Sequence, residues 1–217
     1  MKKGLTELVA ILDMSGSMEP LTNDTIGGYN SMLKEQQKMD RKVLVTTYVF
    51  NNDYQMLHDR VPVDQAAMLS AKEYHPSGCT ALMDAMGDAI KHIANIHRYA
   101  REEDIPEHTV FFITTDGMEN ASTKYSSDDI KRMVKHEQEK YGWEFIYLAS
   151  NIDAVETAFH YGIRPERSVD YHADSIGTRE VYRAASRFIC CLEELSDSED
   201  ENSWRAEADS DFTSRKI

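Results

Sequence analysis

Short runs of consecutive apolar residues recur along the chain, each bounded by polar or turn-forming residues. Runs of this kind are typical of strands that are buried on both faces, as in a parallel sheet covered by helices. The pattern predicts strands at residues 8–12, 43–50, 110–114 and 143–149, with a weaker one at 169–171.

Between these runs, apolar residues recur every three or four positions, which predicts helices with one buried face. The expected helices are a segment at about 24–39, one with its apolar seam at 82–93, one capped by Ser126 and Asp129, a short one ending at Gly162, and a last one from about 178 to 195. One connection differs, because Asn-Asn-Asp at 51–53 is a turn signal between two strand-like runs. A tight hairpin makes the run at 54–57 antiparallel to the strand before it.

This order of elements predicts a doubly wound α/β domain. We expect a mostly parallel central sheet with one antiparallel edge strand and helices on both faces. The domain should cover residues 5–195. From residue 196 to 217 the composition becomes acidic with few large apolar groups, which predicts a disordered tail.

The composition is that of an acidic globular protein. The 217 residues include 24 Lys and Arg against 38 Asp and Glu, a formal net charge of −14. Because no basic stripe is present, we expect no nucleic-acid partner. No apolar run reaches the ~18 residues that a membrane span requires, and Glu7 interrupts the run that resembles a secretory signal. Three cysteines cannot form a disulfide framework, so we expect a cytoplasmic protein with no membrane partner.

Oxygen-bearing side chains follow the predicted strands at their carboxyl ends. Asp13, Ser15 and Ser17 come after the first strand, Thr80 opens the helix that follows the hairpin region, and Asp116 follows the strand at 110–114. Ligand sites of doubly wound sheets lie outside these strand ends. Two carboxylates and three hydroxyls are ligands that suit a hard divalent cation such as Mg²⁺. The sequence therefore predicts a metal site there.

The segment Asp13-Met14-Ser15-Gly16-Ser17, the distant Thr80 and the triplet Thr115-Asp116-Gly117 resemble the metal-ion-dependent adhesion site of the von Willebrand factor A (vWA) domain. The resemblance covers about residues 5–192. It implies that Ser15, Ser17 and Thr80 bind Mg²⁺ or Mn²⁺ directly, with Asp13 and Asp116 acting mainly through water. The resemblance also implies that an acidic side chain of a partner protein completes the coordination, and that the protein is not an enzyme.

Other functions stay open on the sequence alone. One alternative is a Mg²⁺-dependent phosphohydrolase with Asp13 as nucleophile, although Ser15 stands where such enzymes carry a second carboxylate. Another is a scaffold that binds partners through its acidic tail. The tail could also compete for the open metal position through its carboxylates, which include Asp197, Glu199, Asp200, Glu201 and Asp209.

Several neighbours of the predicted ligands have no assigned role. Glu119 and Asn120 either line the site or belong to a solvated loop. We expect Asp84 to lie on a solvated helix face and Cys79 to be packed.

Overall fold

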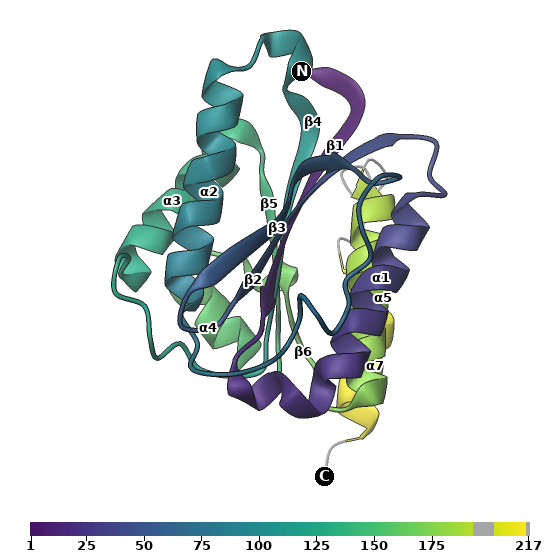
Figure 1. The fold of residues 1–217 in the computed structure, drawn as a ribbon, viewed down its shortest axis with the longest axis vertical. Helices are drawn as coiled ribbons and strands as arrows, with labels where there is room; N and C mark the ends of the chain where they lie inside the picture. The colour runs from purple at the N-terminus through teal and green to yellow at the C-terminus, as the bar shows by residue number, and fades with distance from the viewer. Residues whose placement is uncertain (193–201, 216–217) are drawn as a thin grey trace.

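The computed structural model describes residues 1–192 and 202–215. Its centre is a six-stranded sheet with the strand order β3-β2-β1-β4-β5-β6 (Figure 1). Every pair of neighbours is parallel except β2 and β3, which form the antiparallel hairpin at the edge. The strands are β1 (Lys2–Asp13), β2 (Lys42–Phe50), β3 (Tyr54–Pro62), β4 (Pro106–Thr115), β5 (Glu144–Ala149) and β6 (Ser168–Asp170). The predicted fold class is confirmed.

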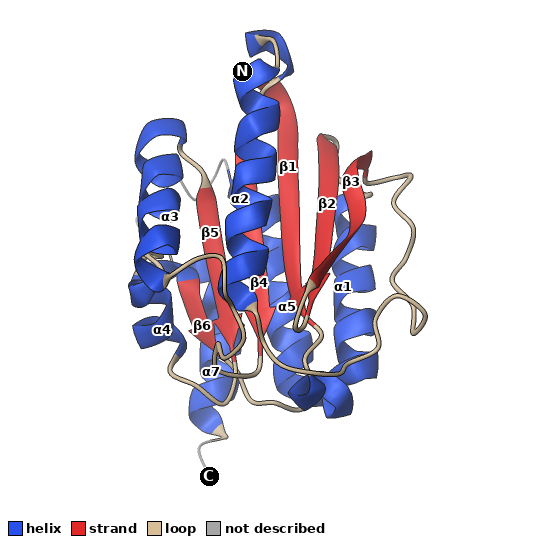
Figure 2. Ribbon diagram, turned by 60° about the vertical axis from the view of Figure 1, so that its left-hand side comes forward, coloured by secondary structure: helices blue, strands red, loops and turns tan. Residues whose placement is uncertain are grey.

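Helices cover both faces of this sheet, as Figures 1 and 2 show. One face carries α1 (Thr22–Gln36), α5 (Ser175–Cys190) and α7 (Ala206–Ser214), and the other carries α2 (Leu82–Tyr99), α3 (Ser127–Tyr141) and α4 (Ala154–His160). Short 3-10 turns are η1 (Gly16–Leu21), η2 (Glu102–Asp104), η3 (Pro165–Arg167) and η4 (Ser203–Arg205). Within the described residues, no helix combines the length and apolar character needed to cross a membrane.

The central strand β1 divides the core into two halves. Leu8, Ala10 and Leu12 pack with the layer that contains α1 and α5, whereas Val9 and Ile11 pack with the layer that contains α2 and α3. This division follows from the two-residue repeat of a strand, which points alternate side chains to opposite faces. It explains why β1 is a continuous apolar run rather than an alternating one.

β1 is longer than the run at 8–12 that predicted it, and it contains a buried acid. Glu7 has no exposed surface, yet its carboxylate is paired with Arg60 of β3 at 2.7 Å and with His97 of α2 at 2.7 Å. A buried carboxylate requires such partners, since an unpaired charge is costly to remove from water. Glu7, which interrupts the apolar run in the sequence, is therefore a residue of β1.

The helix boundaries also differ from the prediction by a few residues. α5 begins at Ser175 rather than at about 178, because the Asp174 carboxylate accepts hydrogen bonds from the amides of Ile176 and Gly177. Such a side-chain cap satisfies amides that the first turn of a helix leaves without partners. The capping box at Ser126 and Asp129 is confirmed at the start of α3.

The prediction of a disordered tail is wrong for residues 202–215. There, η4 and α7 pack on α5, and Trp204 is 2% exposed with its ring 5.2 Å from that of Phe188. Arg215 pairs with Asp174 at the start of α5 at 2.5 Å. Burial of Trp204 helps to hold this segment against α5, which an acidic composition does not reveal. Residues 196–201 and 216–217 of the predicted tail lie outside the described residues.

Candidate metal site

The three predicted segments meet at one edge of the sheet, at the lower end of the molecule in Figure 1. Asp13 ends β1 opposite Phe50 of β2, and Leu12 pairs with Thr114 of β4, so the carboxyl ends of β1 and β4 are neighbours. Asp116 follows directly after β4. The strand register thus brings together residues about a hundred positions apart in the chain.

Four of the five predicted ligands lie on one chain of hydrogen bonds. The Asp13 carboxylate accepts from the Ser15 amide at 2.7 Å, and the Ser15 and Ser17 hydroxyls are 3.2 Å apart. The Ser17 hydroxyl donates to the Asp116 carboxylate at 2.5 Å. These contacts turn three side chains of a single loop toward the same point, next to the carboxylate from β4. This places alternating Asp and Ser oxygens where one ion could contact several of them.

The two carboxylates are buried beside each other, with neutral partners. Asp13 has no exposed surface and Asp116 is 3% exposed. Burial raises the pKa of Asp13 to about 6, against the opposing effect of hydrogen bonds from Thr115 and Ser15, and the charge of Asp116 raises it further. Burial also raises the pKa of Asp116, while the Ser17 hydroxyl lowers it. A cation at this point would lower the cost of ionising both groups.

Thr80 lies at the same edge of the sheet, in a loop that is hydrogen-bonded to the loop after β1 on one side and to the loop after β4 on the other. Gly16 of the first loop donates from its amide to the Gly78 carbonyl at 3.1 Å, and the two backbones approach closely there. Gly78 has a φ of +76°, a conformation that favours glycine. On its other side, Thr80 donates from its amide to the Asn120 side chain at 2.9 Å. Thr80 itself is 3% exposed.

Residues that the sequence left without a role fasten these loops. The Glu119 carboxylate accepts from the amide of Met83 in α2 at 2.9 Å. Asp84 is 8% exposed and accepts from the amide of Thr123 at 2.9 Å, so its expected place on a solvated face is wrong. No sequence signal identifies these two contacts, since they join residues 36 and 39 positions apart in the chain.

The donor set fits a hard divalent cation better than a soft one. Hydroxyl and carboxylate oxygens are the ligands of Mg²⁺ and Mn²⁺, whereas zinc sites are usually built from Cys and His. In the described part of the chain, no three His, Cys, Asp or Glu side chains form a cluster that could hold a metal. The two carboxylates balance the charge of a divalent ion, but if they act through water the direct ligands are neutral hydroxyls, and the ion could still attract a further anionic oxygen.

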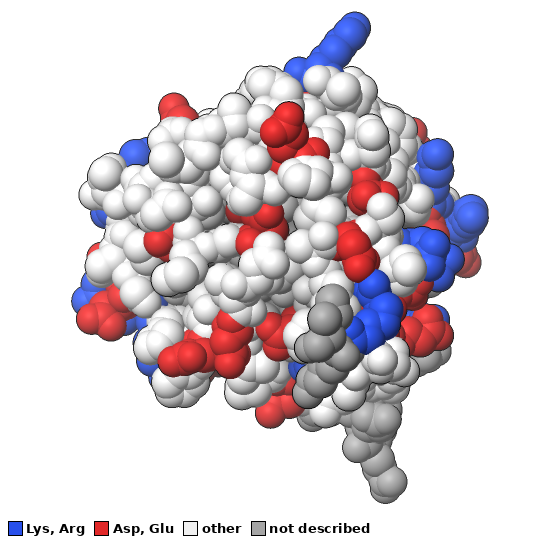
Figure 3. Space-filling model, turned by 90° about the horizontal axis from the view of Figure 1, so that it is seen from below, with Lys and Arg blue, Asp and Glu red and all other residues white. Residues whose placement is uncertain are grey.

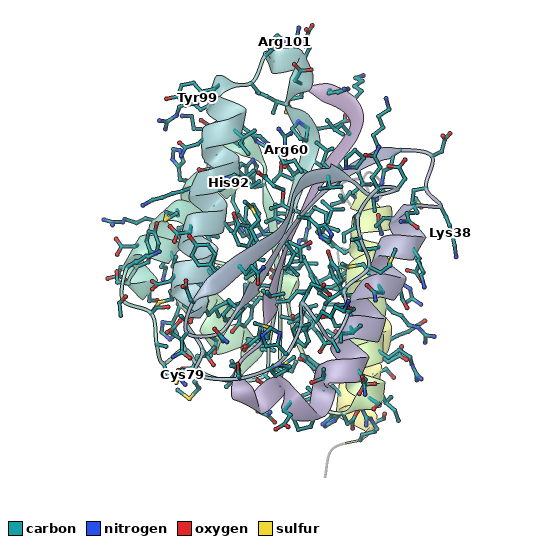
Figure 4. The ribbon with its side chains drawn as sticks, viewed as in Figure 1. Lys38, Arg60, Cys79, His92, Tyr99 and Arg101 are labelled. Atoms are coloured by element: carbon teal, nitrogen blue, oxygen red, sulfur yellow. The ribbon has the colours of Figure 1, made fainter. Side chains whose placement is uncertain are left out.

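The surface around the site is acidic and open. Figure 3 shows this end of the molecule, where acidic side chains are spread over the face while Lys and Arg lie toward its margins. Ser17 and Met118 are exposed beside the buried carboxylates. Cys79 is also exposed rather than packed as expected, and its side chain points away from the body of the protein (Figure 4). The negative surface would raise the local concentration of cations.

Comparisons with known proteins identify the fold. No family profile matches this sequence, and no curated protein matches it. Solved structures do match. The vWF domain of the type V pili tip protein Mfa5 from Porphyromonas gingivalis superposes with a TM-score of 0.64 at 9% identity, covering 86% of this chain and 95% of that one.

Two further structures extend the comparison. A D319A mutant of the PilB minor pilin from Streptococcus sanguinis gives a TM-score of 0.62 at 10% identity, covering 90% of this chain. Proximal thread matrix protein 1 from the mussel byssus, with a zinc-occupied MIDAS motif, gives 0.58 at 11% identity over 85% of this chain. This chain spans 63% of the pilin and 46% of the byssus protein.

These similarities establish that the chain has a vWA fold. At such identities they show the fold alone, so the ligand set Asp13, Ser15, Ser17, Thr80 and Asp116 stays a prediction. MIDAS denotes the metal-ion-dependent adhesion site, and the byssus structure shows that the same fold can hold a divalent metal in such a motif.

Proposed function

We propose that this protein is a metal-dependent protein-interaction module. The observation that carries the proposal is the convergence of two buried carboxylates, Asp13 and Asp116, with the hydroxyls of Ser15 and Ser17 at an open edge of the sheet. Mg²⁺ or Mn²⁺ would bind the hydroxyls of Ser15, Ser17 and Thr80, with the carboxylates acting mainly through water. The pilus and byssus neighbours support an interaction role.

A partner carboxylate would complete the coordination. Because the direct protein ligands are neutral, the inner coordination shell of the ion is positively charged and favours an anionic oxygen from outside. The exposed position of Ser17 beside the buried site leaves a path for a protruding Asp or Glu side chain. Since the surrounding face is acidic, such a side chain would be repelled without the ion. Binding should therefore depend strictly on metal.

The proposed role is not catalytic. Both oxygens of Asp13 are engaged, one by the Ser15 amide and the other by the Thr115 hydroxyl at 2.6 Å. These bonds hold the carboxylate in place, and Ser15 stands where a phosphohydrolase with an Asp nucleophile would carry its second carboxylate. Hydrolysis of an aryl phosphate that is lost in Asp13→Asn would instead support the phosphohydrolase alternative.

Isothermal titration of the EDTA-treated protein with Mg²⁺ and Mn²⁺ tests the proposal. We expect one saturable site in the wild type, no binding in Asp13→Ala, and unchanged binding in Glu19→Gln, which removes an exposed charge close to the same loop. If neither ion binds at millimolar concentration, the metal-dependent role is excluded for the isolated chain.

The tail alternatives need a different test. Deleting residues 196–217 would remove Trp204 from the core and destabilise the domain, so metal removal is the cleaner comparison. Partner capture that survives EDTA would favour the scaffold. Asp209 is a poor competitor for the metal position, because its carboxylate is already paired with Arg205 at 2.7 Å. The other tail carboxylates that we considered lie outside the described residues.

A further inference from the structure

We infer that Glu119, Asn120 and Asp84 are positioning residues of the metal site. They fasten the segment after Asp116 to the start of α2 and thereby hold Thr80 in place. This inference rests on the proposed metal binding, and it assigns roles to residues that are not themselves ligands.

Asn120 fixes the backbone of Thr80 from both sides. The Thr80 amide donates to the Asn120 side-chain oxygen at 2.9 Å. In return, the Thr80 carbonyl accepts from the amides of Asn120 at 3.0 Å and Ala121 at 3.2 Å. Both polar groups of the Thr80 backbone are thus bound by one loop. The position of the Thr80 hydroxyl therefore follows the loop that begins at Asp116.

Glu119 joins the same loop to α2. One carboxylate oxygen accepts from the amides of Ala121 at 2.9 Å and Ser122 at 2.7 Å, which closes a tight turn. The other oxygen accepts from the Met83 amide at 2.9 Å and from the Ser122 hydroxyl at 2.7 Å. A single side chain therefore connects the turn with the first turn of the helix.

Asp84 makes the reciprocal connection from the helix. It is 8% exposed, and its carboxylate accepts from the amides of Thr123 and Lys124, both at 2.9 Å, and Tyr125 at 3.1 Å. The Asp84 amide donates to the Ser122 hydroxyl at 3.1 Å. Carboxylates that accept several backbone amides bind strongly, because the hydrogen bonds are charge-assisted.

These bonds also replace the missing cap of α2. The residue before the helix, Ala81, has no side chain that could accept from the first amides, and the structure gives it no capping bond. The amides of Met83 and Asp84 find their acceptors on Glu119 and Ser122 instead. Free amides in the first turn destabilise a helix. If the loop that contains Glu119 and Ser122 moved away from α2, the amides of Met83 and Asp84 would lose their acceptors. The segments that carry Thr80 and Asp116 therefore form one rigid unit before any ion binds.

Two variants of Asn120 separate positioning from general stability. Asn120→Ala removes the acceptor for the Thr80 amide, whereas Asn120→Asp keeps an oxygen there. We expect Mn²⁺ affinity to fall by about tenfold or more in Asn120→Ala, as for other residues that orient metal ligands, and to recover in Asn120→Asp. Water-proton relaxation should show additional water on the Mn²⁺ of Asn120→Ala, because Thr80 no longer reaches the ion.

Glu119→Gln tests the connection to the helix by itself. A glutamine oxygen can keep the turn amides of Ala121 and Ser122, but its NH₂ group then faces the Met83 amide, donor against donor. Affinity should fall in this variant as well. Glu7→Gln, which disrupts a buried ion pair nearer the start of β1, is the control for lost stability and should bind Mn²⁺ as the wild type does.

The outcomes are distinct. If Asn120→Ala matches the wild type in affinity and bound water, the positioning role is overturned. If the wild type binds no Mn²⁺, the proposed function fails. Whether Asn120 holds the Thr80 backbone in place is then tested by amide hydrogen exchange in EDTA. Faster exchange at Thr80 in Asn120→Ala, with α4 unchanged, would support it; unchanged exchange would overturn it.

Discussion

Replacing Asp13 by Asn should stabilise the metal-free protein while removing the proposed metal site. Asn keeps the acceptor for the Ser15 amide, and its NH₂ group can donate to the Thr115 hydroxyl, whose own proton can turn to the Gly117 carbonyl 3.2 Å away. The substitution therefore preserves the local hydrogen bonds. What it removes is a buried negative charge that neutral partners do not balance.

The size of the effect follows from the raised pKa. The pKa of Asp13 rises from an ordinary 3.8 to about 6 on burial, and each pKa unit is worth ~1.4 kcal/mol, so the ionised group costs about 3 kcal/mol of folding free energy. Between these two values the folded state binds a proton that the unfolded state lacks. The free energy of unfolding of the wild type therefore falls as pH rises toward 6 and then levels off. Below 3.8 both states are protonated and the contribution vanishes.

Urea unfolding of both proteins in EDTA, at several values from about pH 4 to about pH 7.5, measures this difference. The free energy of unfolding of Asp13→Asn should exceed that of the wild type by up to about 3 kcal/mol at about pH 7.5 and by almost nothing at about pH 4. Saturating Mg²⁺ should stabilise the wild type and not the variant, since a ligand stabilises only the state that binds it. An Asp13→Asn protein that is less stable than the wild type at about pH 7.5, or a gap independent of pH, would refute the reasoning.

Three further substitutions test the packing of the fold away from the site. Trp204→Ala should cost about 3–5 kcal/mol of unfolding free energy in urea, because it leaves a cavity against Phe188; a cost below ~1 kcal/mol would show that α7 is not part of the core. Glu7→Gln should cost ~3 kcal/mol by the same measurement, since it leaves a buried ion pair without its acid. Gly28→Ala should cost ~1–3 kcal/mol of stability through overpacking, and so lower the thermal midpoint, because a Cβ there would lie 2.5 Å from the Tyr182 ring. Its refutation would be an unchanged midpoint.

The fold and the candidate ligands could be predicted because the signals are local. A continuous apolar run that ends in Asp13 marks both a buried strand and its carboxyl end, and parallel strands bring such ends to one edge. The hairpin at 51–53 was visible for the same reason, since its turn residues are adjacent in sequence. Each of these inferences needed only a few neighbouring residues.

The features that escaped prediction depend on contacts between distant parts of the chain. Glu119 caps a helix 36 positions earlier in the chain, and nothing near it in the sequence distinguishes it from a solvated acid. Glu7 looks like an interruption until Arg60 and His97 are placed beside it. Residues 202–215 pack on α5 partly through the buried Trp204, one of few large apolar groups among many acids. The average composition of the segment hides the contribution of such a residue, which becomes visible only in the packed structure.

The wide separation of the site residues bears on how the chain is made. Ser17 and Asp116 are bonded to each other although 99 positions separate them, and β4 lies between β1 and β5 in the sheet. During synthesis, β1 leaves the ribosome early but gains its second parallel neighbour only after β4 has emerged. A nascent chain cannot assemble these oxygens before that moment. Uptake of the proposed ion would therefore have to wait until β4 has joined the sheet.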